Sequence, residues 1–138
     1  MSFENDFAKL TFNTENLMCT IIAKKDLPAN DEEFFEFLEY FKNFYLAIDK
    51  IDQKIILYYD LTKLGLLKLD HYSKWSEMFH NNEDISRKCL ICSSVVTGNS
   101  IIANVINGIL KFYDNQKPIE IFTNETDAFK FIKKNLKK

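Results

Sequence analysis

The order of the predicted elements constrains this chain more than any other feature. Two short β-favouring runs come first. A long amphipathic helix pattern followed by an apolar strand pattern then occurs three times, before a closing helix. Strands that alternate with helices indicate parallel pairing, because a parallel connection needs a crossover of about a dozen residues or more. We therefore predict one α/β domain that opens with a β-hairpin and has a mostly parallel sheet of about five strands and four helices.

The hairpin is predicted from the first two runs. Lys9–Thr14 and Leu17–Ala23 are separated only by Glu15 and Asn16. This spacing predicts a two-residue turn in which Asn16 adopts a positive φ angle. The first hairpin is then expected to leave a sheet edge exposed, and an exposed edge can pair with a second copy of the chain.

The next segment carries the strongest helix signal. Asn30 and Glu33 have the spacing of a helix N-cap and its capping box. The helix is expected over Asp31–Asp49, because apolar residues recur there every three or four positions. These residues are Phe34, Phe37, Leu38, Phe41, Phe44, Tyr45 and Ile48.

The second half of the chain is predicted to contain three more strands and three more helices. The strands are expected at Lys54–Tyr59, Lys88–Val96 and Pro118–Phe122, and the helices at Lys68–Phe79, Asn99–Tyr113 and Glu125–Leu136. A polar break is expected between the second helix and the strand that follows it, at Asn81–Asp84. Ala128, Phe131, Ile132 and Leu136 are expected on the inner face of the last helix.

Length, charge and cysteine content narrow the class of protein. The chain has 138 residues, which fits a single domain. Its net charge is −2 and Arg87 is its one arginine, so charge gives no case for nucleic acid as a partner. Leu17–Ala23 is too short to span a bilayer, and no leader pattern is recognisable. Three cysteines in such a chain indicate reduced thiols, so we expect a cytoplasmic protein.

The chain shows no catalytic or metal-binding motif. Cys89 and Cys92 have C-x-x-C spacing, but positions i and i+3 of a strand point to opposite faces, so we interpret both as core thiols. His71 and His80 stand nine positions apart without a carboxylate pattern, and both are expected to be solvated or capping. Serines lack the G-x-S-x-G elbow of hydrolases. We therefore expect no enzyme, no metal and no cofactor.

Polar residues nevertheless follow the predicted parallel strands, where ligands bind in open α/β sheets. The candidate ligand-binding residues are Asp60, Thr62, Thr97, Asn99 and Ser100. The backbone N–H groups of Asn99 and Ser100 can hold an anion at a helix N-terminus. The alternative is that one of these two residues simply caps the helix.

In this arrangement the chain resembles the STAS and SpoIIAA-like group, the sulfate transporter and anti-sigma-factor antagonist domains. The matching features are Ile55–Thr62 (IILYYDLT), which is similar to the group's strand ending in Asp-Leu-Ser, the Ile121-Phe122-Thr123 strand end, and the closing segment Glu125–Leu136. In phosphoswitched members a Ser or Thr opens the helix after the Asp-Leu-Ser strand. Leu69 and Asp70 occupy the corresponding place here, so the phosphorylation switch is not supported, although Asp70 can mimic a fixed negative charge.

The resemblance implies a non-enzymatic binding module for a protein partner or a hydrophobic small molecule. The expected partner surface comprises Leu69, Asp70, Tyr72 and Trp75 on the second helix. Two alternatives remain open at this point. One is a small enzyme acting on a phosphorylated small molecule at the strand carboxyl ends, and the other is a homo-oligomeric assembly protein.

Overall fold

The protein is built on a six-stranded sheet whose strands lie in sequence order. The computed structural model describes residues 2–25, 29–65, 68–111 and 117–137. The first three strands are antiparallel neighbours and the remaining pairs are parallel. The strands are β1 (Ser2–Glu4), β2 (Ala8–Asn13), β3 (Met18–Ala23), β4 (Ile55–Asp60), β5 (Leu90–Val96) and β6 (Ile119–Phe122).

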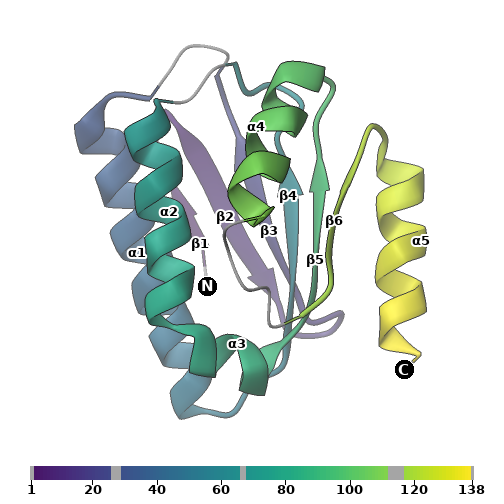
Figure 1. Cartoon of the computed structure of the whole chain (residues 1–138). Coiled ribbons are helices and arrows are strands. Elements are labelled where there is room, and N and C mark those ends of the chain that lie inside the picture. The colour runs from purple at the N-terminus through teal and green to yellow at the C-terminus, as the bar shows by residue number, and fades with distance from the viewer. Residues whose placement is uncertain (1, 26–28, 66–67, 112–116, 138) are drawn as a thin grey trace.

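Five helices surround this sheet in the described part of the chain. They are α1 (Asp31–Lys50), α2 (Leu69–Asn81), α3 (Glu83–Cys89), α4 (Ser100–Lys111) and α5 (Glu125–Leu136). Figure 1 shows α1 to α4 on one side of the sheet and α5 on the other. We call these the α1 side and the α5 side. The predicted end of the fourth helix, at Tyr113, lies outside the described residues.

The α1 side holds a large aromatic core. Helix α1 begins where the sequence predicts, because the Asn30 side chain accepts a hydrogen bond from the Glu33 N–H and the Glu33 carboxylate accepts one from the Asn30 N–H. The buried stripe of α1 faces β2, β3 and β4, and its rings pack in tilted and edge-to-face pairs. The rings of Phe37 and Trp75, for example, join α1 to α2 at 5.4 Å between centroids. Such pairs stabilise a core beyond the area they bury.

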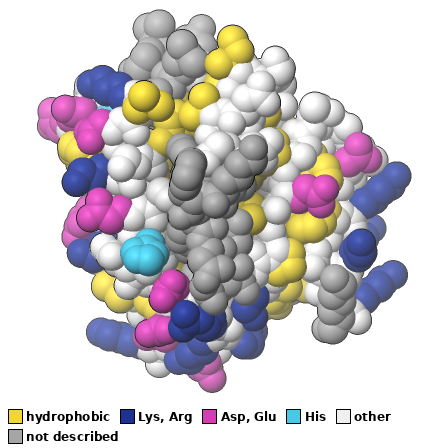
Figure 2. Space-filling model, in the orientation of Figure 1, with side chains coloured by type: hydrophobic (Ala, Val, Ile, Leu, Met, Phe, Trp, Pro, Cys, Tyr) yellow, Lys and Arg dark blue, Asp and Glu magenta, His cyan; other side chains and the backbone are white. Residues whose placement is uncertain are grey.

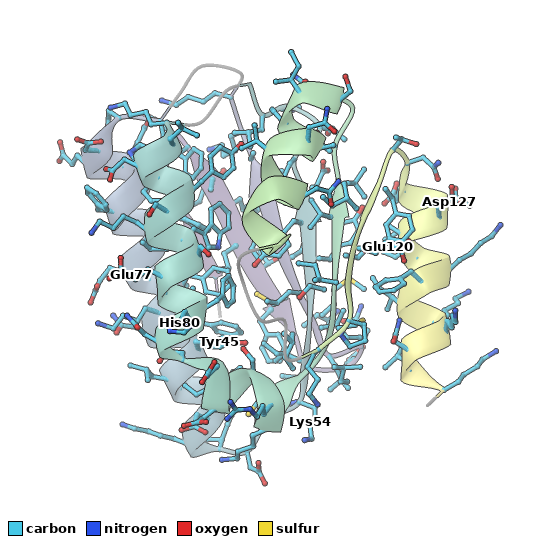
Figure 3. The ribbon with its side chains drawn as sticks, in the orientation of Figure 1. Tyr45, Lys54, Glu77, His80, Glu120 and Asp127 are labelled. Atoms are coloured by element: carbon cyan, nitrogen blue, oxygen red, sulfur yellow. The ribbon has the colours of Figure 1, made fainter. Side chains whose placement is uncertain are left out.

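A hydrogen bond within this core joins α1 to α3. The Tyr45 hydroxyl and the Ser86 hydroxyl lie 2.6 Å apart, and both residues are buried (Figure 3). The sequence predicted a polar break at Asn81–Asp84 and a strand from Lys88. Instead, residues 83–89 form α3, whose Ile85 packs into the core, and the strand begins at Leu90.

The α5 side is smaller. Ala128 and Ile132 of α5 pack on Ile56, Tyr58, Cys92 and Val96 of β4 and β5, and form a separate cluster. Phe129 stacks on Tyr58 with ring centroids 5.1 Å apart. The expected inner residue Leu136 is 46% exposed, because α5 turns Asn135 toward the protein in its place.

The N-terminal end of the sheet differs from the prediction in two respects. The turn between β2 and β3 spans four residues, Thr14 to Leu17, and Leu17 has the positive φ angle of 64° that was expected at Asn16. Asn16 instead uses its side-chain oxygen to accept the Met18 N–H. In addition, β1 pairs with the outer edge of β2, so the hairpin edge that was expected to be exposed is covered by a short strand.

Candidate functional site

The parallel strands end at one side of the molecule, where α1, α2, α4 and α5 begin. Asp60, Val96 and Phe122 are cross-strand neighbours at the ends of β4, β5 and β6. We call this region the carboxyl edge, meaning the described residues within 24–35, 60–72 and 97–102. In open α/β sheets it is the usual position for a ligand.

Asp60 stabilises its own loop at the carboxyl edge. Its Oδ1 accepts hydrogen bonds from the Thr62 backbone N–H at 3.1 Å and from the Thr62 hydroxyl at 2.7 Å. The next residue, Leu61, donates its backbone N–H to the Val96 carbonyl oxygen, so the β4 end is fixed to β5 as well. Asp60 and Thr62 therefore lie together, and their polar groups are engaged with each other.

The loop after β5 has a similar internal network. Thr97 is buried, its N–H donates to the Phe122 carbonyl oxygen, and its hydroxyl accepts the Asn99 N–H at 3.2 Å. Asn99 Oδ1 in turn accepts the N–H groups of Ile101 and Ile102, at 2.9 and 3.3 Å. These bonds cap the first turn of α4 with the Asn99 side chain. Ser100, the first residue of the helix, is exposed.

A polar pair that the sequence reading missed lies at the N-termini of α1 and α2. His71 was expected to be solvated or capping, but it is fully buried, and its Nε2 lies 2.8 Å from Asp31 Oδ1. Its ring stacks on Phe34, with centroids 4.1 Å apart and planes 2° apart. His71 precedes Trp75 and Met78 at i+4 and i+7, so helical spacing could have placed it on the inner face of α2.

The pair shifts the pKa of the Asp31 carboxyl. The hydrogen bond from His71, together with the Lys68 ammonium at 3.3 Å, holds the pKa of the Asp31 carboxyl below its ordinary value of 3.8. Both partners favour the ionised carboxylate. In the described part of the structure, the other imidazole nitrogen, Nδ1, is buried without a hydrogen-bond partner. The His71–Asp31 pair thus fastens the start of α2 to the start of α1.

The carboxyl edge also exposes large apolar side chains. Leu69 at the start of α2 is 76% exposed, and Ile101 in the first turn of α4 is 61% exposed. Phe35 on α1 is 40% exposed and lies against the His71 ring. Figure 2 shows hydrophobic side chains over the upper ends of α2 and α4.

The predicted partner surface on α2 divides into two halves. Leu69 and Asp70 are exposed at the carboxyl edge, as a partner surface requires. Tyr72 is buried, and the half-buried Trp75 packs against the core. Helical spacing separates these pairs, because residues 72 and 75 lie on the inner face of α2, so Tyr72 and Trp75 belong to the core and not to the predicted surface.

The cysteines lie on different sides of the sheet. Cys19 and Cys89 belong to the core on the α1 side, whereas Cys92 lies under α5. Burial raises the pKa of the Cys19 thiol to about 12 and that of Cys92 to about 11, so both are protonated at neutral pH. Among the described residues, no three His, Cys, Asp or Glu side chains are placed to hold a metal ion.

Comparison with solved structures decides the fold. The chain is similar to the crystal structure of an uncharacterised protein of the DUF3478 family with a SpoIIAA-like fold, from Shewanella loihica PV-4. The TM-score is 0.61 at 13% sequence identity, and the match covers 95% of this chain and 98% of that one. The chain has a SpoIIAA-like fold. No family model and no curated protein matches the sequence.

The SpoIIAA-like fold confirms the resemblance drawn from the sequence, including the N-terminal hairpin and the mostly parallel sheet. At this level of identity the match concerns architecture, and function has to be argued from this chain's own surface. Within the described residues, no helix has both the length and the apolar character needed to cross a membrane.

Proposed function

We propose that this protein is a non-enzymatic binding module that engages a protein partner through its carboxyl edge. The supporting observation is the exposure of Leu69, Ile101 and Phe35 at the edge where SpoIIAA-like sheets end their parallel strands. Exposed apolar side chains grouped at one end of a molecule favour association with another protein, because association removes them from water. Asp70, exposed beside Leu69, adds a negative charge to this surface.

The chemistry of the same edge supports binding over catalysis. An enzyme acting on a phosphorylated small molecule would use Asp60, Thr62, Thr97 and Ser100. The Asp60 carboxylate and the Thr62 hydroxyl are bonded to each other, and the Thr97 hydroxyl accepts the Asn99 N–H. A group that holds a loop in this way is less free to act on a substrate. A loop-fixing role for these residues therefore supports the binding module.

Two other kinds of partner are weaker proposals. A homodimer would pair through β1, but a strand of three residues offers few backbone groups to a second copy. A hydrophobic small molecule would need space between α1 and the sheet, where the rings of Phe7, Phe34 and Phe37 already pack together.

The three free cysteines support action in a reducing compartment such as the cytosol.

The experiment is a quantitative affinity capture from cells with three forms of the protein. These are the wild type, Leu69→Asp, and Ile51→Asp as the matched control. Ile51 is 70% exposed at the other end of α1, about 30 Å from its start. We expect a protein that the wild type and Ile51→Asp capture equally, and whose affinity for Leu69→Asp, measured with the purified partner, is at least about tenfold lower.

Two results would contradict the proposal. One is identical capture by all three forms, because the carboxyl edge would then play no part in partner binding. The other is an extra mass of a few hundred daltons, on the order of a drug-sized ligand, that native mass spectrometry finds on the purified protein and that is lost on denaturation. That mass would make the protein a small-molecule carrier and direct further work to the ligand.

A further inference from the structure

A second surface lies on the opposite side of the sheet, along α5. Lys130, Lys133, Lys134 and Lys137 recur at helical spacing and are all exposed. Among the described residues, no carboxylate forms an ion pair with any of these four. Figure 2 shows Lys and Arg side chains gathered along this side of the molecule. We call these four residues the lysine stripe.

Because α5 packs on the sheet through one face, the lysine stripe on its opposite face points away from the sheet. Ala128, Ile132 and Asn135 are buried toward the sheet, and the Asn135 side chain donates a hydrogen bond to the Phe131 carbonyl oxygen. Successive residues of a helix are turned by about 100°, so the lysine stripe lies on the face opposite these buried residues. The four positions run along about 10 Å of helix. The stripe is therefore a fixed, outward-facing row of positive charge.

A large group of acidic residues lies on the other side of the sheet, whereas the two on α5, Glu125 and Asp127, stand in its first turn, before the lysine stripe begins. Helix α1 begins with Asp31, Glu32 and Glu33 and continues with Glu36 and Glu39, and it lies on the other side of the sheet (Figure 1). The charges are therefore unevenly distributed, with five carboxylates in the first half of α1 and four lysines from Lys130 onward along α5. In the field of an anionic surface, such a molecule turns α5 toward that surface and α1 away from it.

We propose that the lysine stripe docks the protein onto an anionic lipid surface. A lysine-rich amphipathic helix attracts acidic lipid headgroups through diffuse charge and needs no arginine fork. Leu136, which is 46% exposed, is a helical neighbour of Lys133 and can enter the headgroup region beside it. This exposed leucine favours a lipid surface over nucleic acid, whose backbone offers no apolar layer.

Vesicle sedimentation tests the proposal. We expect the wild type to bind phosphatidylcholine vesicles with about 30% phosphatidylserine, and to bind pure phosphatidylcholine far more weakly. At 1 M salt the Debye length falls to about 3 Å, so the bound protein should be released. Each lysine near such a surface strengthens binding roughly fivefold, so Lys133→Gln/Lys134→Gln should weaken it about 25-fold.

The matched control is Lys42→Gln/Lys50→Gln. Both lysines are exposed on α1, and their loss changes the net charge by the same amount. This control should bind anionic vesicles nearly as tightly as the wild type. The proposal is overturned if the wild type does not prefer anionic vesicles, or if the control loses as much affinity as the α5 variant. Tighter binding to a DNA duplex or an RNA than to the vesicles, lost in the α5 variant, would overturn the lipid assignment.

Discussion

The hydrophobic cores on the two sides of the sheet differ in size and in how they are held together. On the α1 side, four helices bury a cluster of interlocking aromatic rings, and a hydroxyl pair and a histidine–carboxylate pair connect the helices. On the α5 side, one helix covers β4 and β5 with a small cluster, and the outer face of β2 and β3 is only partly buried. From this difference we infer that most of the stability comes from the α1 side. Substitutions on the surface of the α5 side should therefore affect folding less.

The comparison is tested most severely by Phe37→Ala. Phe37 is fully buried, and its ring contacts those of Phe7, Phe41 and Trp75. We expect the free energy of unfolding to fall by about 3–5 kcal/mol, because the cavity forms inside a close-packed aromatic cluster. Urea denaturation measures the loss. The control is Phe35→Ala on the same helix, which should cost far less because Phe35 is 40% exposed.

Ile132→Ala probes the α5 side. Ile132 is buried over Cys92, and we expect its truncation to lower the free energy of unfolding by about 2–3 kcal/mol. The measurement is iodoacetamide labelling followed by mass spectrometry, in mild urea. Cys92 should react sooner than Cys19, because opening α5 alone exposes Cys92. Ile132→Ala should speed the labelling of Cys92, and Cys92 should remain faster than Cys19, whose exposure requires the α1 side to open as well.

Equal labelling rates for Cys92 and Cys19 would break the comparison, since both sides would then open together. Burial raises the pKa of Cys19 to about 12 and that of Cys92 to about 11 in the folded protein, but both thiols react from an opened state in which they are exposed. Measuring at two pH values checks that the two exposed thiols have similar thiolate fractions.

Asp60→Ala tests whether the carboxyl edge depends on its loop anchors. The substitution removes the acceptor of two hydrogen bonds from Thr62, so we expect a loss of about 1–2 kcal/mol in the free energy of unfolding. Asp70→Ala, at an exposed position of the same edge, should cost little. Wild-type stability in Asp60→Ala would mean that the carboxylate is available for another role.

The smallest expected effect concerns acid stability at the α1–α2 junction. The folded pKa of Asp31 lies below 3.8, so the carboxylate stabilises the protein above about pH 4 and loses this effect as pH falls through the folded pKa. Asp31→Asn should therefore be less stable than the wild type at pH 6, and the difference should shrink toward pH 3. Urea denaturation across this range measures it, with Glu32→Gln as the control. A difference independent of pH would contradict the ion-pair account.

Local signals in the sequence were sufficient for most of the architecture. The capping box at Asn30 sets the start of α1 and forms as predicted, and the Asn124 side chain caps α5 by accepting the Asp127 N–H. The aromatic stripe of α1 was readable because every buried position follows one helical period. Short apolar runs bounded by polar residues predicted β4 and β5. The predicted ends of both strands lie within two residues of the observed ends.

The remaining features depend on contacts made only after folding. Helix α3 has too few residues for a periodic signal, and it is stabilised by packing Ile85 and by the Tyr45–Ser86 hydrogen bond. Burial of His71 requires Asp31, which lies 40 residues earlier in the sequence. The predicted site residues lie at the strand ends, but the hydrogen bonds that engage Asp60 and Asn99 could not be read from residue types alone.

The strand order carries a consequence for biosynthesis. Each strand pairs with the strand made just before it, so no pairing has to wait for a distant part of the chain. Short separations make chain closure less costly in entropy, and synthesis proceeds from the N-terminus, so the sheet can grow strand by strand as it leaves the ribosome. Helix α5 is the exception, because it packs back across β4 and β5 after β6 has emerged. Until α5 has been made, the nascent sheet exposes the apolar residues that this helix later covers, Ile56, Tyr58, Cys92 and Val96.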